Sequence, residues 1–503
     1  MSTLAGSLDG YQHVTVPRLA RGPVLSAMAA MAVLLTVFSA GYGYHRDELY
    51  FRMLTPAWGY VDQPPLSPLL VHLFSTFVAD EPWAIRIPAT LAASASVLVL
   101  ALITRELGGS RAAQVLCAWA YAFAAFPLLM GHLMLTSTID LLAWPAVTLF
   151  VIRALLRHQP GWWYAAGAVA ALSTYNKLLI AALVAALGIG LLIAGPRRAF
   201  LSAHLAWAAL VALLIAAPNV LYQVLNGWPQ LGMGAALAHK NASDVRIQMW
   251  PFLVLLLGPP LLPIWIAGLM ALLRRPGWRR VRFLAVAFAL ILVFTFAAGS
   301  QFYYPFGLLA VVFAAGCVPT AAFMARSAAR WRNTLAIGVA VNAAVSAVLG
   351  LPLLPLSVLG ASPVPSVSQV AADQVGWPAY VRQVAAVYRD VPAADRGRTV
   401  IITSNYGEAG ALARYGPELG LPQPYSGHNQ LYFRSRPPDG SMTAVVVGSQ
   451  IRSTRQLFSS CILAGRLDNG VGVRNEEQGQ AITLCHGPLA AWTTMWPAFR
   501  HYD

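Results

Sequence analysis

The sequence predicts a polytopic α-helical membrane protein that carries a soluble α/β domain at its C-terminal end. Of the 503 residues, 58% are hydrophobic and only 11% are charged, against about 25% charged in an ordinary soluble protein. Apolar runs long enough to cross a bilayer recur up to about residue 355. From about residue 363 the composition changes to short β-rich runs that alternate with helical stretches, the pattern of an α/β domain.

Eleven membrane spans are expected in the hydrophobic region. A span requires about 20 apolar residues, or fewer where neighbouring helices shelter it. The spans are expected near residues 24–44, 85–103, 112–130, 141–156, 163–175, 178–194, 201–218, 251–273, 283–300, 304–322 and 334–355. The short pair around Asn176 and Lys177 is the weakest, and its loss would leave both chain ends on the same sides of the membrane.

The charged residues between these spans predict the orientation. Alternate loops are basic, from Arg18 and Arg21 before the first span to the clusters at 274–282 and 326–332, as cytoplasmic loops are. Residues 1–23 are therefore expected in the cytoplasm, ahead of an uncleaved signal-anchor helix, and residues 363–503 outside the cell (plasma) membrane. The net charge of +15 then reflects topology. The sequence has no basic face with a groove-reading motif, so a nucleic acid partner is not expected.

Two long outer loops, residues 45–84 and 219–250, lie within the membrane domain 24–356. The first is rich in aromatic residues and proline ("WGYVDQPPLSPLL") and contains "PLLVHLFSTFVA", which is too short to span and predicts a helix lying on the membrane. The second contains "NGWPQLGMGAALAHKNASDVRIQ" and is expected to be a mobile cover. Long outer loops above a helix bundle indicate a site at the outer membrane face.

The C-terminal segment, residues 363–503, combines expected strands with expected helices. The runs "RTVIITSNY", "TAVVVGSQ" and "AITLCHG" are β-rich, whereas "WPAYVRQVAAVYRD" and "EAGALARYG" are helical. Cys461 and Cys485 lie here and can pair if the domain faces an oxidising compartment. The segment contains no GxGxxG fingerprint, P-loop or zinc spacing. Candidates for binding an acceptor glycan are Ser404, Asn405, Tyr406, Glu408 and His428, although a helix-capping turn explains most of them as well.

Two adjacent acids stand where the first apolar run ends, in "GYGYHRDELYFRML". An isolated acid at the interface can be tolerated without a function, but charges at membrane depth are costly and tend to be functional. Asp47 and Glu48 lie beside Arg46 and Arg52 and ahead of a proline-pinned loop. A carboxylate at this place can act as a general base on a hydroxyl or amine held at the membrane surface.

The segment "HRDELYF…WGYVDQPPLSPLL" resembles the first outer loop of the GT-C glycosyltransferases of the dolichyl-phosphate-mannose protein mannosyltransferase and aminoarabinose transferase superfamily, family 39-like. The resemblance extends over essentially all of the hydrophobic region. It implies an inverting membrane enzyme that moves a sugar from a polyprenyl-phosphate carrier to an outer acceptor, which is a protein, a glycolipid or a cell-envelope glycan. It implies that Asp47 is the base and that Glu48 orients the acceptor or Asp47.

The resemblance also points to residues beyond the first loop. Asp140, in "MLTSTIDLL", matches an acid that faces the first-loop Asp in the family, although an acid here also favours the start of a helix. Lys177, in "STYNKLLIA", matches a lysine suited to the carrier phosphate, although lysines at helix ends also reach the interface without a function.

Further candidates for substrate binding lie near the outer ends of the spans. Arg52 follows the acidic pair, and the second long loop holds His239, Lys240 and Arg246, which can close over the carrier phosphate or simply be solvated. Of these, Arg246 is favoured because an Arg binds phosphate through two hydrogen bonds. Tyr303 and Tyr304, in "SQFYYPF", match an aromatic segment that contacts the donor in the family, although interfacial tyrosines are common.

The sequence departs from its relatives in two respects and leaves alternatives open. Gln63 stands where aminoarabinose transferases carry Lys, and the MIR domain of eukaryotic protein mannosyltransferases is absent, so neither acceptor class follows from the resemblance. A divalent metal ion between Asp47 and Asp140 is an alternative to the nearby cations. The competing functions are a lipid-linked sugar transporter or flippase, which would place its acids near the membrane midplane, and a membrane assembly scaffold.

Overall fold

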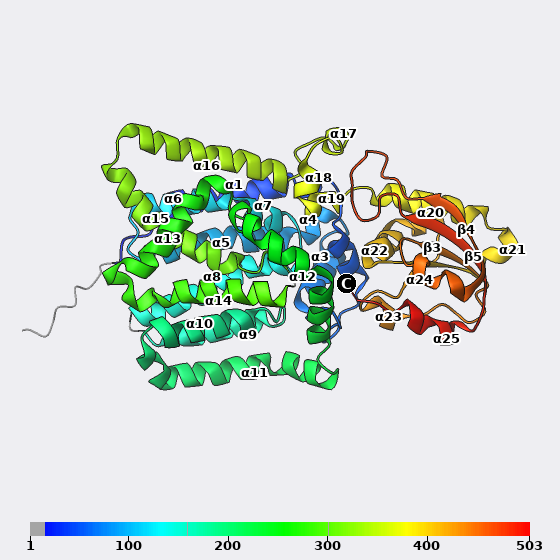
Figure 1. The fold of residues 1–503 in the computed structure, drawn as a ribbon, viewed down its shortest axis with the longest axis horizontal. Helices are drawn as coiled ribbons and strands as arrows, with labels where there is room; N and C mark the ends of the chain where they lie inside the picture. The colour runs from blue at the N-terminus through cyan, green and yellow to red at the C-terminus, as the bar shows by residue number, and fades with distance from the viewer. Residues whose placement is uncertain (1–15, 158, 300, 503) are drawn as a thin grey trace, which may run out of the picture.

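The structure, a computed structural model, describes residues 16–157, 159–299 and 301–502. Residues 1–15 of the segment expected in the cytoplasm lie outside this description. Figure 1 shows a bundle of long, roughly parallel helices at one end of the molecule and an α/β domain at the other, with short helices between them.

The helical domain runs from α1 to α16. Its helices are α1 (Arg21–Val37), α2 (Arg46–Met53), α3 (Leu66–Phe77), α4 (Pro82–Ile85), α5 (Ile87–Glu106), α6 (Arg111–Ala122), α7 (Ala125–His132), α8 (Thr136–Leu156), α9 (Gly161–Ser173), α10 (Ile180–Ala194), α11 (Ala203–Leu225), α12 (Pro229–Leu255), α13 (Leu262–Arg274), α14 (Phe283–Ala298), α15 (Phe306–Arg326) and α16 (Ala329–Gly350). Short 3₁₀ turns at Arg197–Leu201, Pro259–Leu261 and Pro276–Val281 connect some of them.

A described helix lies in each of the eleven predicted spans. Within the described residues, five helices are long and apolar enough to cross a membrane, and up to seven spans result if each of two bent pairs is counted as one. The pairs are α6 with α7, bent by 53°, and α12 with α13, bent by 72°. The protein is therefore a multi-pass membrane protein, as predicted, while eleven crossings and the orientation of the termini stay predictions.

The second long loop is largely helical. Residues 219–250 form the last part of α11 and most of α12, separated by a short turn at Asn226–Trp228, and the role of this segment as a mobile cover stays a prediction. Pro251 lies inside α12, so the helix continues into the expected span rather than beginning there. The loop composition was misleading because its glycines and polar residues are tolerated on the partly exposed surface of a helix.

The first long loop contains two helices, α2 and α3. The stretch "PLLVHLFSTFVA" forms α3, which confirms a helix there; Leu69, Leu73 and Phe77 on it are exposed, as a membrane-facing surface requires. Its position on the membrane surface stays a prediction.

The ends of the helices that were expected to face the cytoplasm come together. Arg153 and Arg157, in the last turn of α8 and just after it, both pair with Glu106 at the end of α5, at 3.0 and 2.6 Å. Arg105 donates a hydrogen bond to the Pro17 carbonyl oxygen. The basic segments of several predicted inner loops therefore lie at one end of the bundle, in agreement with the positive-inside pattern.

The C-terminal domain contains a five-stranded mixed sheet. Its strands are β1 (Thr399–Thr403), β2 (Tyr425–Ser426), β3 (Thr443–Val447), β4 (Phe458–Arg466) and β5 (Ala481–Pro488), in the order β2-β1-β3-β5-β4. β1 is parallel to β2 and β3, whereas β5 is antiparallel to β3 and β4. Its helices are α17 (Leu356–Leu359), α18 (Val364–Val367), α19 (Gln369–Ala372), α20 (Trp377–Asp390), α21 (Ala393–Arg396), α22 (Tyr406–Tyr415), α23 (Leu431–Arg434), α24 (Ile451–Thr454) and α25 (Trp492–Met495), with 3₁₀ turns at Pro417–Leu419, Arg455–Leu457 and Trp496–Phe499.

Alternating strand residues cover the two faces of this sheet. Ile401 and Val445 pack with α20 and α22 on one face. Val400 and Val446 pack on the other face with Trp492 and its neighbours at the C-terminal end of the chain. The period of two is that of a strand buried on both faces, so the α/β character predicted from the sequence is confirmed.

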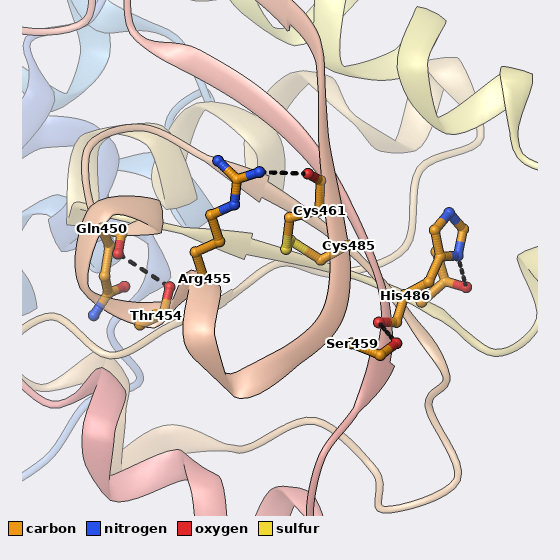
Figure 2. The surroundings of a disulfide bond; sticks show 8 residues. Gln450, Thr454, Arg455, Ser459, Cys461, Cys485 and His486 are labelled. Atoms are coloured by element: carbon orange, nitrogen blue, oxygen red, sulfur yellow. Dashed lines mark hydrogen bonds between the residues drawn. A yellow bond between two sulfur atoms is a disulfide. The ribbon is translucent and has the colours of Figure 1, made fainter.

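A disulfide bond joins the neighbouring strands β4 and β5 of this domain. Cys461 and Cys485 are register partners in the sheet, and Figure 2 shows their sulfur atoms bonded between the two strands. The Arg455 guanidinium donates a hydrogen bond of 3.2 Å to the Cys461 carbonyl oxygen beside the bond. Cys117 and Cys317, in the helical domain, are buried and free.

The two domains share one apolar core where α2 meets α22. Leu49 and Tyr50 of α2 belong to the same buried cluster as Ala409 and Leu412 of α22. A Cβ atom on Gly410 would lie 2.6 Å from the Leu49 carbonyl carbon, so only glycine permits this approach. The α/β domain therefore packs directly on the helix that carries the acidic pair.

Candidate active site

A large cavity of about 1230 Å³ lies where the helical domain meets the α/β domain. Its polar end is lined by Asp47, Asp62 and Lys177 from the helical domain and by Tyr406 and Glu476 from the α/β domain. Its other end is lined by apolar side chains of α10 and α14, and α12 adds both apolar and polar side chains. The cavity thus joins an apolar groove to a cluster of charged groups.

The first turn of α2 fixes the position of Asp47. His45 is the N-cap residue, and its Nδ1 accepts a hydrogen bond of 3.1 Å from the Asp47 backbone N–H. Burial lowers the pKa of His45, which keeps the ring neutral and leaves Nδ1 free to accept. Glu48 closes the capping box by accepting a hydrogen bond of 2.8 Å from the His45 backbone N–H. Two acids in the first turn also favour the helix dipole.

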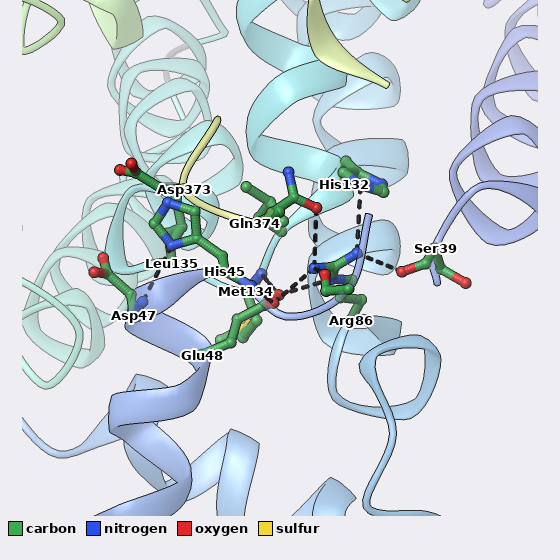
Figure 3. Close-up of polar contacts among 12 residues, drawn as sticks. Ser39, His45, Asp47, Glu48, Arg86, His132, Met134, Leu135, Asp373 and Gln374 are labelled. Atoms are coloured by element: carbon green, nitrogen blue, oxygen red, sulfur yellow. Dashed lines mark hydrogen bonds and ion pairs between the residues drawn. The ribbon is translucent and has the colours of Figure 1, made fainter. Parts of the chain in front are cut away.

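Glu48 points away from the cavity and forms a buried ion pair with Arg86, as Figure 3 shows. Both side chains are almost completely buried, with exposed fractions of 0% and 1%. The Arg86 guanidinium contacts both oxygens of Glu48, at 2.8 and 2.7 Å, and also donates to the carbonyl oxygens of Ser39 and Gly43. Glu48 therefore does not contact a substrate in the cavity, and its geometry is that of a residue that holds α2 in place.

Asp47 faces the cavity and accepts a hydrogen bond from the α/β domain. The Tyr406 hydroxyl donates to Asp47 Oδ1 at 2.9 Å. Burial and the nearby Asp47 carboxylate raise the pKa of Tyr406, so the hydroxyl stays protonated and keeps donating. The other carboxylate oxygen, Oδ2, takes part in no hydrogen bond within the described residues, which leaves it available to a ligand.

The two arginines beside the acids have different neighbours. Arg46 lines the cavity, pairs with Glu476 of the α/β domain and lies 4.8 Å from the Tyr406 ring. Arg52, a predicted substrate contact, instead pairs with Asp80 and does not line the cavity. Arg52 is in the last turn of α2, six residues beyond the first helical position. It therefore lies at the end of the helix opposite to the acidic pair.

Lys177 lies at the junction of the charged cluster and the apolar groove. Its Nζ donates a hydrogen bond of 3.3 Å to Ser137 Oγ and lies 5.4 and 5.0 Å from the rings of Tyr303 and Tyr304. Both tyrosines line the cavity. The structure thus brings together three residues that the sequence analysis named separately, around one cation that can hold a phosphate.

Asp140 lies beside this group but outside the large cavity. It lines a smaller adjoining cavity of about 20 Å³ with Ser137, Tyr303 and Tyr304, and it accepts a hydrogen bond of 3.4 Å from the Asn176 side chain. It is the fifth residue of α8, beyond the first turn, so the expected helix-start role has no support. Asp140 shares this small cavity with Ser137, which accepts the hydrogen bond from Lys177.

The three candidates of the second long loop are separated by the helical form of that segment. Lys240 lines the cavity, whereas His239 and Arg246 do not. The Arg246 guanidinium donates to the Phe296 carbonyl oxygen at 3.2 Å and lies over the Phe296 ring. Consecutive residues on a helix point in directions about 100° apart, and His239 is exposed and does not line the cavity.

The described residues of this site do not form a set of metal ligands. Within the described part of the chain, no three His, Cys, Asp or Glu side chains gather as a metal-binding group. Asp47 and Asp140 line different cavities, which does not fit the expected position of an ion between them. We therefore derive no step through a metal ion.

Several site residues were not singled out from the sequence. Asp62 lines the cavity, and burial raises its pKa to about 7. Arg474 lines the cavity from the α/β domain, and Arg86 holds Glu48. Tyr406 was expected only as a residue that could bind an acceptor glycan, and its contact with Asp47 was not predicted. Asp62 belongs to the segment "VDQPP" of the first long outer loop, so its place in that loop could have identified it as a site residue. The contacts of Tyr406 and Arg86 depend on tertiary packing, which leaves no local pattern.

Comparisons with known proteins identify the fold. Residues 62–222 match the sequence model of the family described as dolichyl-phosphate-mannose-protein mannosyltransferase. No curated protein matches the sequence.

Among solved structures, the crystal structure of ArnT from Cupriavidus metallidurans bound to undecaprenyl phosphate is similar over 92% of this chain and 98% of that chain, at 17% identity and a TM-score of 0.62. Its apo state gives 16% identity and a TM-score of 0.61, covering 93% of this chain and 98% of that chain. The cryo-EM structure of the arabinofuranosyltransferase AftD from Mycobacteria is similar over 92% of this chain and 40% of that chain, at 14% identity and a TM-score of 0.51.

These similarities confirm the predicted fold class. The chain has the GT-C fold, a helical membrane domain followed here by an α/β domain with a five-stranded sheet.

Proposed function

We propose that this GT-C protein is a membrane glycosyltransferase that moves a sugar from a polyprenyl-phosphate carrier to an extracytoplasmic acceptor, with Asp47 as the base. The observation that carries the proposal is the single cavity that joins an apolar groove to Asp47 and Lys177. A lipid-linked sugar needs both environments at once, because its tail is apolar and its phosphate and sugar are polar.

The apolar groove suits the tail of such a carrier. On α10, Ala181, Ala182, Ala185, Ala186 and Ile189 line the cavity, and their spacing places them on one helix face. Their side chains are mostly small, and the groove follows α10 for about 14 Å at 1.5 Å per residue. Leu290 and Phe294 of α14, a helix that packs against α10, line the same cavity.

Lys177 is the group that would hold the carrier phosphate. It stands where the groove meets the polar end of the cavity, and its ammonium group can stabilise the negative charge that develops on the departing phosphate. Arg474 and Lys240 line the same cavity and add positive charge. The similar crystal structure of ArnT is bound to undecaprenyl phosphate, which supports a carrier of this chemical class.

Asp47 is placed to activate the acceptor. Its carboxylate accepts a proton from the acceptor hydroxyl or amine as that atom attacks C1 of the sugar, and the bond between C1 and the phosphate oxygen breaks. The carrier phosphate leaves with the bonding electron pair. Attack from the side opposite the phosphate inverts the configuration at C1. Tyr406 fixes the carboxylate through its hydrogen bond to Oδ1.

The test uses the full-length protein in detergent with a panel of polyprenyl-phosphate sugars and an envelope extract as acceptor. We expect release or transfer of sugar from one donor, and a loss of about 10²- to 10⁴-fold in Asp47→Asn, the range of general-base catalysis. Asp395→Asn, which changes a side chain of α21 that is 45% exposed and lines neither cavity, is the matched control and should keep full turnover. Equal turnover in Asp47→Asn and wild type would remove Asp47 as the base. Donor movement across vesicles without sugar release would favour a flippase.

A further inference from the structure

A second cavity, of about 340 Å³, lies within the α/β domain at the carboxyl ends of β1 and β3. Ser404 and Asn405 follow β1, and Ser449 and Gln450 follow β3; all four line the cavity. β1 lies between β2 and β3 in the sheet. The connection after β1 leads to β2 on one side of it, and the connection after β2 leads to β3 on the other side, so the strand order reverses at β1. Ligands of open α/β sheets bind at such a switch point.

Two side chains that line this cavity have oxygen atoms with no hydrogen-bond partner among the described residues. Glu408 has an exposed fraction of only 4%, and its Oε2 accepts hydrogen bonds from the backbone N–H groups of Ser404 and Asn405, at 2.8 and 3.2 Å. Its Oε1 takes part in no hydrogen bond with the described residues and is left to the cavity. A side chain on Gly448, which has a φ of +90°, would collide with that oxygen. The buried Oε1 of Gln450 likewise has no described partner.

The lining favours a ligand with many hydroxyl groups. Ser404, Ser449, Asn405, Gln450 and Glu408 offer hydroxyl, amide and carboxyl groups, which together can both donate and accept hydrogen bonds. A phosphate or a nucleotide would need several cations, and an apolar ligand would leave these groups unpaired. A saccharide hydroxyl donates and accepts at once, and therefore matches such a lining.

The second cavity is linked to the first. Glu476 lines both. The Tyr406 ring, whose hydroxyl contacts Asp47, stacks on His428 at 4.8 Å, and His428 stacks on His501 at 4.7 Å. His501 lines the second cavity. The two cavities are therefore neighbours that share Glu476 in their linings.

We propose that the cavity at the carboxyl ends of β1 and β3 is a saccharide-binding subsite for the acceptor, so that the acceptor of this protein is a glycan. The inference rests on the proposed function for its placement beside Asp47, but the binding itself does not require turnover. Glu408 and Gln450 hold an inner sugar unit, and the terminal hydroxyl of the same glycan reaches the Asp47 carboxylate.

The experiment measures binding of the full-length protein in detergent to an array of defined manno-, gluco-, galacto- and arabino-oligosaccharides. Ser449→Trp fills the cavity from an exposed position and leaves the fold intact, and Glu408→Gln keeps the shape of the capping residue. Arg452→Ala, an exposed residue of α24 that does not line the cavity, is the control. We expect wild type and Arg452→Ala to bind at least one glycan, and Ser449→Trp and Glu408→Gln to bind it at least tenfold more weakly.

Two results would overturn the inference: no binding of any glycan by the wild-type protein, or binding that Ser449→Trp leaves unchanged. Asp47→Asn separates this inference from the proposed function. If it retains glycan binding and loses donor turnover, both stand. If the wild-type protein turns over no donor while Ser449→Trp abolishes glycan binding, the transferase proposal fails and the subsite remains.

Discussion

The Tyr406 hydroxyl donates a hydrogen bond of 2.9 Å to Asp47 Oδ1, so that a side chain of the α/β domain orients the carboxylate of a helix in the membrane domain. Two further contacts join α2 to the α/β domain: Arg46 pairs with Glu476, and Tyr50 stacks on Tyr406 at 4.7 Å. The α/β domain therefore completes the candidate active site.

The first prediction concerns Tyr406 as a positioning residue. Tyr406→Phe should lower kcat about 10- to 100-fold, because a hydrogen bond to a charged group contributes about 1.5–3 kcal/mol. KM for the lipid-linked donor should stay unchanged, since the ring still fills its place. Tyr388→Phe, which removes a hydrogen bond of 3.1 Å to the Arg396 carbonyl oxygen elsewhere in the domain, is the control. A rise in KM with an unchanged kcat would assign Tyr406 to substrate binding instead.

The second prediction separates structure from chemistry at Glu48. Glu48→Gln should lower the free energy of unfolding by about 3–5 kcal/mol, because it leaves the buried Arg86 charge without its partner. Thermal unfolding in detergent measures this effect. The double variant Glu48→Gln with Arg86→Met should recover part of the loss, as expected for two groups that interact directly. A stable but inactive Glu48→Gln would instead make Glu48 a direct participant in the reaction.

The third prediction concerns the phosphate site at Lys177. Lys177→Met should weaken the binding of undecaprenyl phosphate about 10- to 100-fold, through loss of a charge-assisted contact of about 1.5–3 kcal/mol. Equilibrium binding of the labelled carrier lipid, without sugar, measures the change. Arg246→Met is the control, because Arg246 contacts Phe296 outside the cavity. Equal weakening in both variants would indicate a general loss of membrane-facing charge rather than a phosphate site at Lys177.

Hydropathy and charge patterns predict this architecture well because each acts locally. Apolar runs locate the helices of the bundle, and the α20 segment "WPAYVRQVAAVYRD" was predicted with the boundaries that it has. The errors arise where a tertiary contact overrides a local pattern. Glycines and polar residues at 226–250 indicate a loop, but the chain forms α12 there because a helix satisfies its backbone groups beside the bundle.

The candidate site was only partly predictable for the same reason. The position of Asp47 at the end of an apolar run and the lone Lys177 are visible in the sequence. The difference between Asp47 and Glu48 is not visible, because it depends on Arg86, 38 residues further along the chain. The contact of Tyr406 with Asp47 depends on the packing of α22 against α2, which Gly410 permits. No short sequence motif predicts this packing.

The fourth prediction concerns the Cys461–Cys485 bond and the side of the membrane on which the α/β domain lies. The bond closes a sequence separation of 24 residues, for which a chain-entropy model gives roughly 3 kcal/mol of stabilisation. Dithiothreitol should therefore lower the Tm of the α/β domain in the wild-type protein, and should have no effect on Cys461→Ser with Cys485→Ser. Free thiols at both positions in protein isolated from membranes would contradict an extracytoplasmic C-terminal domain.

The fifth prediction is a pH dependence of stability that Asp62 causes. Burial raises the pKa of Asp62 to about 7 in the folded protein, against about 3.9 in an unfolded chain. Between these values the folded state binds a proton that the unfolded state has released. The stabilisation from this group is complete below about pH 4 and is lost as the pH rises through about 7.

Asp62→Asn removes this titration while keeping the size of the side chain. The quantity compared is the free energy of unfolding of the variant minus that of wild type. We expect this difference to be about 1–2 kcal/mol larger at pH 8 than at pH 5, a value reduced for the partial exposure of the group. Thermal unfolding at both pH values measures it, with Asp395→Asn as the control for loss of an exposed acid. If Asp62→Asn and wild type lose stability in parallel over this range, Asp62 is already ionised at pH 5 and the cavity is more hydrated than its side chains indicate.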